Sequence, residues 1–325
     1  MSLPKVFITR PLPAVAVQRI AQSCEVSMNP QDIRLTPQEM IAACREVEGV
    51  VTSSTPIGAD VVEQAPRLRV VSAVAVGYDI IDLDACTRRG VLVTNTPGVV
   101  TEATADLSFG LLMCVARRLV EADRFVREGH WKFWEFGCMW GTDLSGKTLG
   151  VYGFGRIGQA VARRARGFNM RIIYHSIDRP TPEQERELGA QFVDRDTLLR
   201  EADFLTIHVP LAPDTHHLVG AAQLALMKPT AFLINSSRGK VVEEAALVEA
   251  LQSKRIAGAG LDVFEFEPKI HPALFTMPNV VMTPHMGTST GETRTAMALM
   301  AADNLLAALA GQRPANLVNT EAWKS

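Results

Sequence analysis

The sequence predicts an α/β protein with parallel sheets and two domains. Short apolar runs alternate along the chain with stretches of helical composition, as in strands joined by helical crossovers. These runs lack strict polar alternation, which is expected of strands covered by helices on both faces. The 325 residues correspond to about two domains of roughly 150 residues each.

Four runs in the first hundred residues predict strands, namely KVFITRPL, GVVTSS, LRVVSAVAV and GVLVTNTP. Six runs in the second half predict a further series, namely TLGVYGFG, MRIIYHS, ADFLTIHVP, TAFLINSS, AGAGLDVF and NVVMTPH. Between the two series, residues 101–127 contain a single glycine, Gly110, and predict one long helix that crosses between domains. The following segment, rich in Gly and Trp, predicts a loop. Residues 294–311 predict a closing helix that ends at Gly311, and composition leaves open which domain it packs on.

Composition narrows the classes of partner. The chain has 33 basic and 35 acidic side chains, a formal net charge of −2 and no long block of either sign. This balance argues against nucleic acid or an anionic membrane as the main partner. The N-terminal residues lack the features of a secretion signal, and the longest apolar stretch, LSFGLLMCVA, is far short of a membrane span.

The cysteines indicate a reducing compartment. They are odd in number and widely spaced, without a C-x-x-C pair, at Cys24, Cys44, Cys86, Cys114 and Cys138. Neither a disulfide framework nor a zinc site is indicated, so we expect scattered thiols, no metal and a cytoplasmic location.

A glycine-rich turn predicts dinucleotide binding. Gly153, Gly155 and Gly158 form a G-x-G-x-x-G pattern after an apolar run and before a helical segment. The first glycine permits a tight turn, the second lets the backbone approach a pyrophosphate, and the third permits close packing of helix on strand. The N–H groups that open the helix then face the phosphates. Arg156 either adds a charged contact or faces solvent.

The segment RIIYHSID bears on which dinucleotide is bound. An acidic residue that binds the adenosine ribose is expected about 20 residues after the glycines, and Ser176 and Asp178 lie 18 and 20 residues after Gly158. If the strand ends at His175, Ser176 faces the ribose. A serine does not repel a 2′-phosphate, and Arg179 lies close enough in sequence to attract one.

Three polar residues, Arg238, Glu267 and His285, each follow a predicted strand of the second series. The carboxyl ends of parallel strands meet in one crevice, where ligands bind. Reduction of a 2-keto acid needs a proton for the carbonyl oxygen, and histidine is a natural donor near neutral pH when a carboxylate stabilises its charged form. Arginine can hold a carboxylate through two N–H groups and polarise the keto oxygen.

The motifs AVGYDIIDLDA, GFGRIG, NSSRG, GLDVFEFEP and TPHMG occur in this order along the chain. Together they resemble the D-isomer-specific 2-hydroxyacid dehydrogenase family, and within it the glyoxylate/hydroxypyruvate reductases and bacterial 2-ketogluconate reductases. The resemblance implies two Rossmann-like domains with parallel sheets and a cleft between them. The outer, flavodoxin-like substrate domain would comprise residues 1–100 plus 287–325, and the dinucleotide-binding domain residues 101–286.

The resemblance also implies roles for individual residues. It implies that Arg238 binds the substrate, that His285 is the catalytic acid/base and that Glu267 orients His285. Backbone N–H groups of Val76 and Gly77 would hold the substrate carboxylate, although the residues alone favour a simple turn there. Further cofactor contacts are implied at Thr104, Ile157, Val209, Pro210, Ser236, Ser237, Asp262 and Gly287. Asp262 is open to a second interpretation, as a cap at the end of its strand.

The resemblance implies NAD(P)H-dependent reduction of small 2-keto acids, such as glyoxylate, hydroxypyruvate and 2-ketogluconate, to D-2-hydroxy acids. Ser176 and Arg179 lean the choice of cofactor towards NADP(H) over NAD(H), while Asp178 leaves NAD(H) open. Two alternatives remain. The first is oxidation of phosphite, but family members that catalyse it carry a lysine in place of Val76, so its absence argues against this activity. The second is a dinucleotide-sensing corepressor, which would retain the fold without turnover.

The resemblance further implies a homodimer formed through residues 101–140. Trp131, Trp134 and Trp140 would supply aromatic anchors of the kind that interfaces favour. The alternative is that these tryptophans only pack their own loop.

Overall fold

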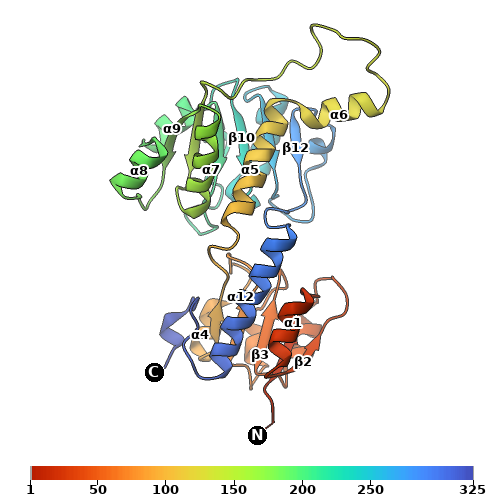
Figure 1. The fold of residues 1–325 in the computed structure, drawn as a ribbon, viewed down its shortest axis with the longest axis vertical. Helices are drawn as coiled ribbons and strands as arrows, with labels where there is room; N and C mark the ends of the chain where they lie inside the picture. The colour runs from red at the N-terminus through yellow and green to blue at the C-terminus, as the bar shows by residue number, and fades with distance from the viewer. Residues whose placement is uncertain (1, 325) are drawn as a thin grey trace. The chain divides into compact units, whose positions relative to one another are not determined.

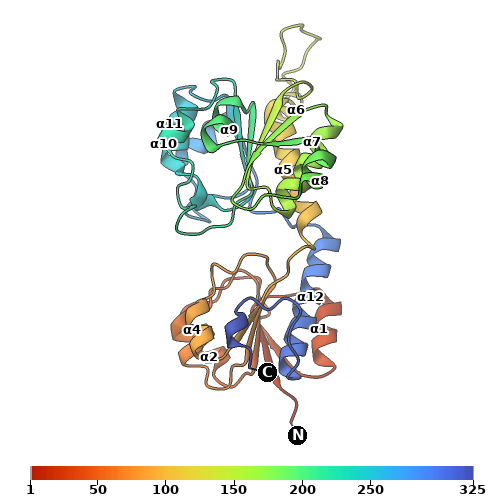
Figure 2. The same cartoon turned by 90° about the vertical axis from the view of Figure 1, so that its left-hand side faces the viewer.

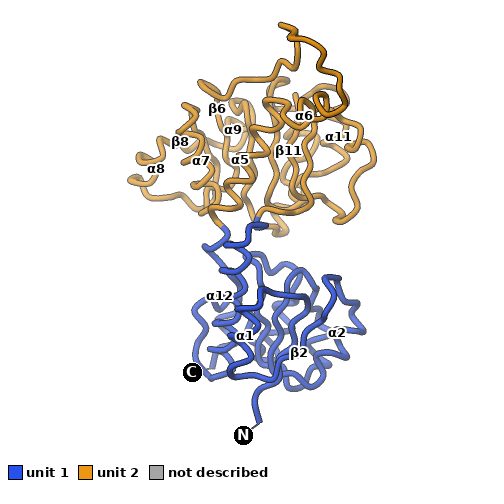
Figure 3. Tube along the Cα trace, turned by 45° about the vertical axis from the view of Figure 1, so that its right-hand side comes forward, with its two compact units in different colours: residues 1–100, 288–325 blue, residues 101–287 orange. Residues whose placement is uncertain are grey.

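The computed structural model describes residues 2–324, which divide into two compact units. Unit 1 contains residues 1–100 and 288–325, and unit 2 contains residues 101–287 (Figure 3). Gly287 was expected in the outer domain, but it lies in unit 2. Its N–H donates to the buried Asp262 carboxylate of unit 2 at 2.9 Å, which ties it to that unit.

Unit 1 is built on a parallel sheet of five strands in the order β2-β1-β3-β4-β5. The strands are β1 (Lys5–Ile8), β2 (Glu25–Met28), β3 (Gly49–Thr52), β4 (Val70–Ala73) and β5 (Leu92–Thr94). The interior strands β3 and β4 are buried along their whole length. This burial explains their continuous apolar runs.

Helices cover both faces of the unit 1 sheet (Figure 2). They are α1 (Ala14–Ala21), α2 (Pro37–Cys44), α3 (Ala59–Glu63), α4 (Leu83–Arg88), α12 (Gly291–Leu309) and the 3-10 helix η3 (Thr320–Ala322). The closing helix α12 contacts α1, β3, β4 and β5, and therefore packs on unit 1. It buries a stripe that includes Met297, Ala301 and Leu305, spaced by four residues along one helix face.

Unit 2 is built on a parallel sheet of seven strands in the order β12-β11-β10-β9-β6-β7-β8. The strands are β6 (Thr148–Tyr152), β7 (Arg171–His175), β8 (Ala190–Phe192), β9 (Phe204–Ile207), β10 (Phe232–Asn235), β11 (Gly258–Leu261) and β12 (Val280–Met282). Strands β7 and β8 lie on one side of β6, whereas β9 and the later strands lie on the other. The strand order therefore reverses between β6 and β9, and the loops that follow these two strands run in opposite directions. Ligand sites of open parallel sheets lie at such a switch point.

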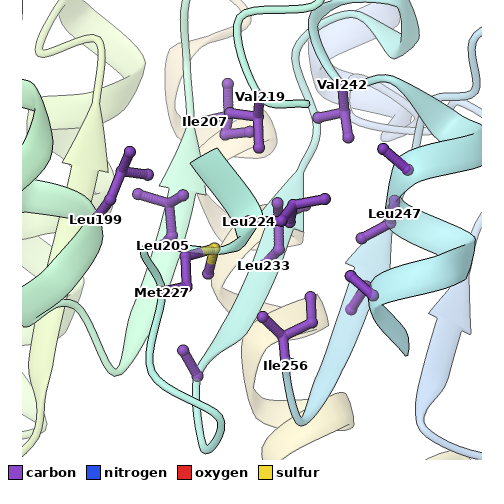
Figure 4. Packing of buried hydrophobic residues seen from close by; sticks show 14 of the residues in the cluster. Leu199, Leu205, Ile207, Val219, Leu224, Met227, Leu233, Val242, Leu247 and Ile256 are labelled. Carbon is purple, nitrogen blue, oxygen red and sulfur yellow. The ribbon is translucent and has the colours of Figure 1, made fainter. Parts of the chain in front are cut away.

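Helices of unit 2 form a layer on each side of its sheet (Figure 2). Those on one side are α5 (Thr101–Ala116), α7 (Arg156–Gly167) and α8 (Pro182–Leu188); those on the other are α9 (Arg195–Glu201), α10 (Ala221–Leu224) and α11 (Glu244–Gln252). Two 3-10 helices, η1 (Gly239–Val241) and η2 (Pro272–Thr276), lie in the connections. Leu205 and Leu233 of the sheet pack with Leu247 of α11 in one apolar core (Figure 4). Phe154, Tyr174 and Leu112 belong to the core on the other face.

The prediction of one long helix over residues 101–127 is wrong, because the chain forms two helices there, α5 and α6 (Leu119–Arg127) (Figure 1). The break lies at Arg118, whose φ of 52° is left-handed. The Ala116 carbonyl accepts a hydrogen bond from the backbone N–H of Thr142 at 2.8 Å. The end of the following loop thus occupies the helical acceptor that would have continued α5.

Two strands escaped the sequence analysis, β2 and β8. Both lie at sheet edges, and neither contains a fully buried residue. Edge strands bury little surface, so they lack the apolar run by which the other strands are recognisable. In the part of the chain that the structure describes, no helix combines the length and apolar character needed to cross a membrane.

Candidate active site

The three glycines of the G-x-G-x-x-G turn follow β6 and open α7. Gly153 has a φ of 88°, and a Cβ there would lie 2.7 Å from the His208 carbonyl oxygen. A Cβ on Gly158 would lie 2.3 Å from the Gly153 carbonyl oxygen. Both positions therefore require glycine for steric reasons, one for the tight turn and one for helix–strand packing.

Gly155 is different, because a Cβ built on it meets nothing within 4 Å. It is the N-cap of α7, and no side chain caps the helix N–H groups. Arg156 is exposed in the first turn, whereas Ile157 is half-buried against the core of unit 2. An uncapped helix N-terminus with open space in front of it fits a dinucleotide pyrophosphate.

Ser176 is the first residue after β7, as the sequence analysis predicted. Asp178 and Arg179 are exposed two and three residues further on. The Arg179 guanidinium forms an ion pair with Glu185 at 2.9 Å and lies over the Phe192 ring, 4.5 Å from its centroid. The arginine is therefore held beside the end of β7, with part of its charge offset by Glu185.

Arg238, Glu267 and His285 follow the neighbouring strands β10, β11 and β12. The His285 Nδ1 and Glu267 Oε2 atoms lie 2.9 Å apart, and Glu267 Oε1 accepts the N–H of Phe264 at 3.0 Å. Burial raises the pKa of the Glu267 carboxyl, but hydrogen bonding to His285, the charges of His285 and Arg238 and the Phe264 N–H together bring it below its ordinary value. The unit 2 sheet thus brings the three predicted residues to one edge.

The turn that carries Arg238 is built by Asn235. The Asn235 amide donates to the Arg238 carbonyl at 3.0 Å, and its Oδ1 accepts from the N–H and hydroxyl of Ser237 at 3.1 and 2.9 Å. Arg238 Nη1 donates to the Ser237 carbonyl at 2.9 Å. Ser237, a predicted cofactor contact, therefore uses its side chain within this turn.

Asp262 supports the segment that carries His285. The carboxylate is fully buried and accepts hydrogen bonds from the Thr283 hydroxyl at 2.6 Å and from the N–H groups of Met286 and Gly287 at 2.8 and 2.9 Å. The Asp262 carbonyl accepts the His285 N–H at 2.9 Å. Burial raises the pKa of this carboxyl, and the three hydrogen bonds and the His285 charge, which favour ionisation, do not fully offset it. This arrangement matches the strand-end cap that the sequence left open.

A second group of predicted cofactor contacts gathers near Asp262. A Cβ built on Gly287 would lie 3.4 Å from Asp262 Oδ2 and 3.5 Å from Thr104 Cγ2. The Ser108 hydroxyl hydrogen-bonds the Thr104 carbonyl and the Ser236 hydroxyl, each at 2.6 Å, and so joins α5 to the end of β10. Ser108 was not among the predicted residues, although a serine in the middle of an apolar helix is a visible signal in the sequence.

The remaining predicted residues lie after β9 in unit 2 and after β4 in unit 1. Val209 is half-buried beside Gly153, and the Pro210 carbonyl accepts the Thr215 hydroxyl at 2.7 Å. Val76 and Gly77 follow β4 in unit 1, where the Asn95 amide donates to the Val76 carbonyl at 2.8 Å.

Residues 109–287 match the family model described as "D-isomer specific 2-hydroxyacid dehydrogenase, NAD binding domain". The chain belongs to this family. As a D-2-hydroxyacid dehydrogenase, it is an oxidoreductase that binds a nicotinamide dinucleotide. The glycine turn and the uncapped N-terminus of α7 fit this cofactor.

Relatives of this dehydrogenase span its whole length. It is 50% identical to glyoxylate reductase of Thermococcus litoralis, with 99% of this chain and 98% of the relative covered. It is 49% identical to glyoxylate reductase of Korarchaeum cryptofilum, with 99% and 97% covered. Among solved structures, an NADPH-dependent glyoxylate/hydroxypyruvate reductase of Sinorhizobium meliloti in complex with NADP and malonate matches at 34% identity and a TM-score of 0.88, with 99% and 98% covered.

Within residues 2–324, no group of three or more His, Cys, Asp or Glu side chains is arranged to hold a metal ion. The five cysteines are free thiols, and burial raises the pKa of Cys44 and of Cys86 to about 12.

Proposed function

We propose that the enzyme reduces small 2-keto acids, namely glyoxylate, hydroxypyruvate and 2-ketogluconate, to D-2-hydroxy acids, with His285 as the proton donor. The observation that carries this proposal is the His285–Glu267 pair at 2.9 Å, at the same sheet edge as Arg238. The names of the relatives support glyoxylate-type keto acids as the substrate class.

When bound, the reduced dinucleotide supplies a hydride to the carbonyl carbon of the keto acid. His285 has its Nδ1 engaged by Glu267, so its Nε2 is the atom that exchanges a proton with the carbonyl oxygen. Arg238 polarises this oxygen and stabilises the negative charge that develops on it. The backbone N–H groups of Val76 and Gly77 bind the substrate carboxylate.

We further propose that NADP(H) is preferred over NAD(H). The residue after β7 is Ser176, which brings no negative charge against a 2′-phosphate. Arg179 lies three residues after Ser176 in the chain. Its contacts with Phe192 and Glu185 restrict the side chain before the ligand binds. A relative with 34% identity is named as NADPH-dependent, which supports the same preference.

The test compares kcat/KM for NADPH and NADH with glyoxylate, hydroxypyruvate and 2-ketogluconate as acceptors. Turnover of at least one of these acids, abolished by His285→Ala, is the expected result. Oxidation of phosphite without reduction of any keto acid would contradict the proposal. Dinucleotide binding without turnover would instead identify the corepressor alternative.

We also propose a homodimer formed through residues 101–140. Helix α6 and the loop after it expose large apolar side chains, namely Leu119, Val120, Val126, Trp131, Phe133, Trp134, Phe136 and Trp140. So many exposed aromatic groups in one segment are unusual for a free surface and suit an interface between two copies. Light scattering of the wild type and of a Trp134→Ser, Phe136→Ser variant tests this, and a monomeric wild type would contradict it.

The free, widely spaced cysteines are consistent with the cytoplasmic location expected from the sequence. Fractionation of the native host, with the enzyme followed by immunoblot, would test this placement.

A further inference from the structure

We propose that Glu244 and Glu265 are positioning residues that hold Glu267 against His285. The two carboxylates form a clasp outside the predicted site, which we call the Glu244–Glu265 clasp. The inference rests on the proposed role of His285 as proton donor.

Glu244 closes the loop that carries Glu267. This loop runs from the end of β11 to η2, and the Glu244 side chain is 7% exposed beneath it. Its Oε2 accepts the N–H of Glu265 at 3.1 Å and its Oε1 accepts the N–H of His271 at 2.8 Å. Because these two N–H groups lie on either side of Glu267 in the chain, one carboxylate fixes both ends of the loop.

Glu265 returns the same contact. Its Oε2 accepts the N–H of Glu244 at 3.0 Å, and its Oε1 lies 2.7 Å from Nε2 of His217. Glu244 is the first residue of α11, so the Glu265 carboxylate lies at the positive end of a nine-residue helix. Each carboxylate therefore binds the other residue's backbone, and His217 completes the clasp.

The clasp also holds the Arg238 turn in register with the Glu267 loop. The His217 N–H donates to the Lys240 carbonyl at 2.8 Å, two residues after Arg238. Gly239 lies so close to Phe264 and Glu265 that no side chain fits between the two segments. The chain that carries Arg238 and the chain that carries Glu267 are thus packed backbone to backbone and tied by the same residues.

Nearly buried carboxylates are costly unless every oxygen is satisfied. A loop that needed only to be closed has cheaper solutions in apolar packing. The clasp instead supplies directed hydrogen bonds to backbone groups two residues before and four residues after Glu267. Such bonds fix position, and misplacement of a catalytic group by about 1 Å costs roughly 100-fold in rate.

The experiment compares Glu244→Gln and Glu265→Gln with Glu249→Gln, a matched control on the exposed face of α11. Glutamine keeps one acceptor oxygen, so each variant loses one of the hydrogen bonds that its carboxylate made and keeps the other. We expect kcat for glyoxylate to fall roughly 10- to 100-fold in both clasp variants, with the Kd for NADPH within about twofold of wild type. The control keeps the wild-type kcat.

The pH profile separates positioning from simple stability. The charged groups that face Glu267 are His285 and Arg238, and both lower the pKa of its carboxyl. When the clasp is weakened these contacts loosen, so the pKa of Glu267 rises and the acid-side loss of kcat/KM begins at higher pH. His217→Gln, which keeps a hydrogen-bond donor, should shift the pH profile less and in the same direction. This variant replaces the two glutamate variants in the test if they do not fold.

Two failures are distinguishable. A wild type and control that reduce no keto acid would refute the proposed function. Active wild type and control, with clasp variants that lower Tm but keep the wild-type kcat and pH profile, would refute the positioning role alone.

Discussion

Gly239→Ala is the substitution whose consequence the structure defines most sharply. Gly239 directly follows Arg238 and is buried against the loop that carries Glu267. A Cβ at this position would lie 1.9 Å from the Phe264 carbonyl oxygen, 2.0 Å from its carbonyl carbon and 2.6 Å from the Glu265 nitrogen. All three are backbone atoms, so no side-chain rotation relieves the overlap.

The magnitude follows from these distances. Restoring an ordinary contact requires the two backbone segments to separate by about 1.5 Å. Overpacking of this kind costs about 1–3 kcal/mol of unfolding free energy. A displacement of this size between Arg238 and Glu267 also predicts a fall of roughly 100-fold in kcat/KM for glyoxylate.

The assay is steady-state kinetics together with urea unfolding, with Gly167→Ala as the control. Gly167 is the last residue of α7, and a Cβ there meets nothing within 4 Å. Alanine at this helical position should leave kcat/KM unchanged and stability equal or slightly higher. A Gly239→Ala enzyme within about threefold of the wild-type kcat/KM would show that the two segments need no tight register, and would refute the reasoning.

Three further outcomes are expected. Arg238→Ala should lower kcat/KM for glyoxylate by roughly 1,000-fold while the Kd for NADPH, measured by fluorescence quenching, stays within about twofold; loss of both would contradict its assigned role. Because the pKa of Glu267 is lowered from its ordinary value of 4.5, its contribution to stability is present above that value and lost as pH falls through the lower folded pKa. The unfolding free energies of wild type and Glu267→Gln should therefore converge in urea titrations below pH 4.5, and a constant difference would argue against the His285 contact. Arg179→Ala should raise the KM for NADPH about tenfold and leave that for NADH unchanged, and an equal effect on both would place the 2′-phosphate elsewhere.

Local sequence determined the strands of the sheet interiors and the glycine turn. Buried parallel strands need apolar residues on both faces, so β3, β4 and β9 are visible as continuous runs. The spacing of Gly153, Gly155 and Gly158 was equally readable, because a tight turn and close helix packing are demands on single residues. The placement of Arg238, Glu267 and His285 after strands followed from the same pattern.

Tertiary structure decided the features that depend on partners far along the chain. The end of α5 depends on Thr142, whose backbone N–H donates to the Ala116 carbonyl. No residue within 101–127 indicates this contact. For Asp262 the sequence left a cofactor contact and a strand-end cap open, and only the fold shows that its oxygens accept hydrogen bonds from Thr283, Met286 and Gly287. Edge strands β2 and β8 were invisible because they bury too little surface to need an apolar run.

The Glu244–Glu265 clasp shows the limit most clearly. In sequence, Glu244 is an ordinary acidic residue in the first turn of a helix, and Glu265 one of two glutamates after a strand. Only the fold brings each carboxylate to the other's backbone N–H. Periodicity and propensity report how a residue meets its near neighbours and solvent, whereas a hydrogen bond between distant segments depends on where the whole chain has carried them.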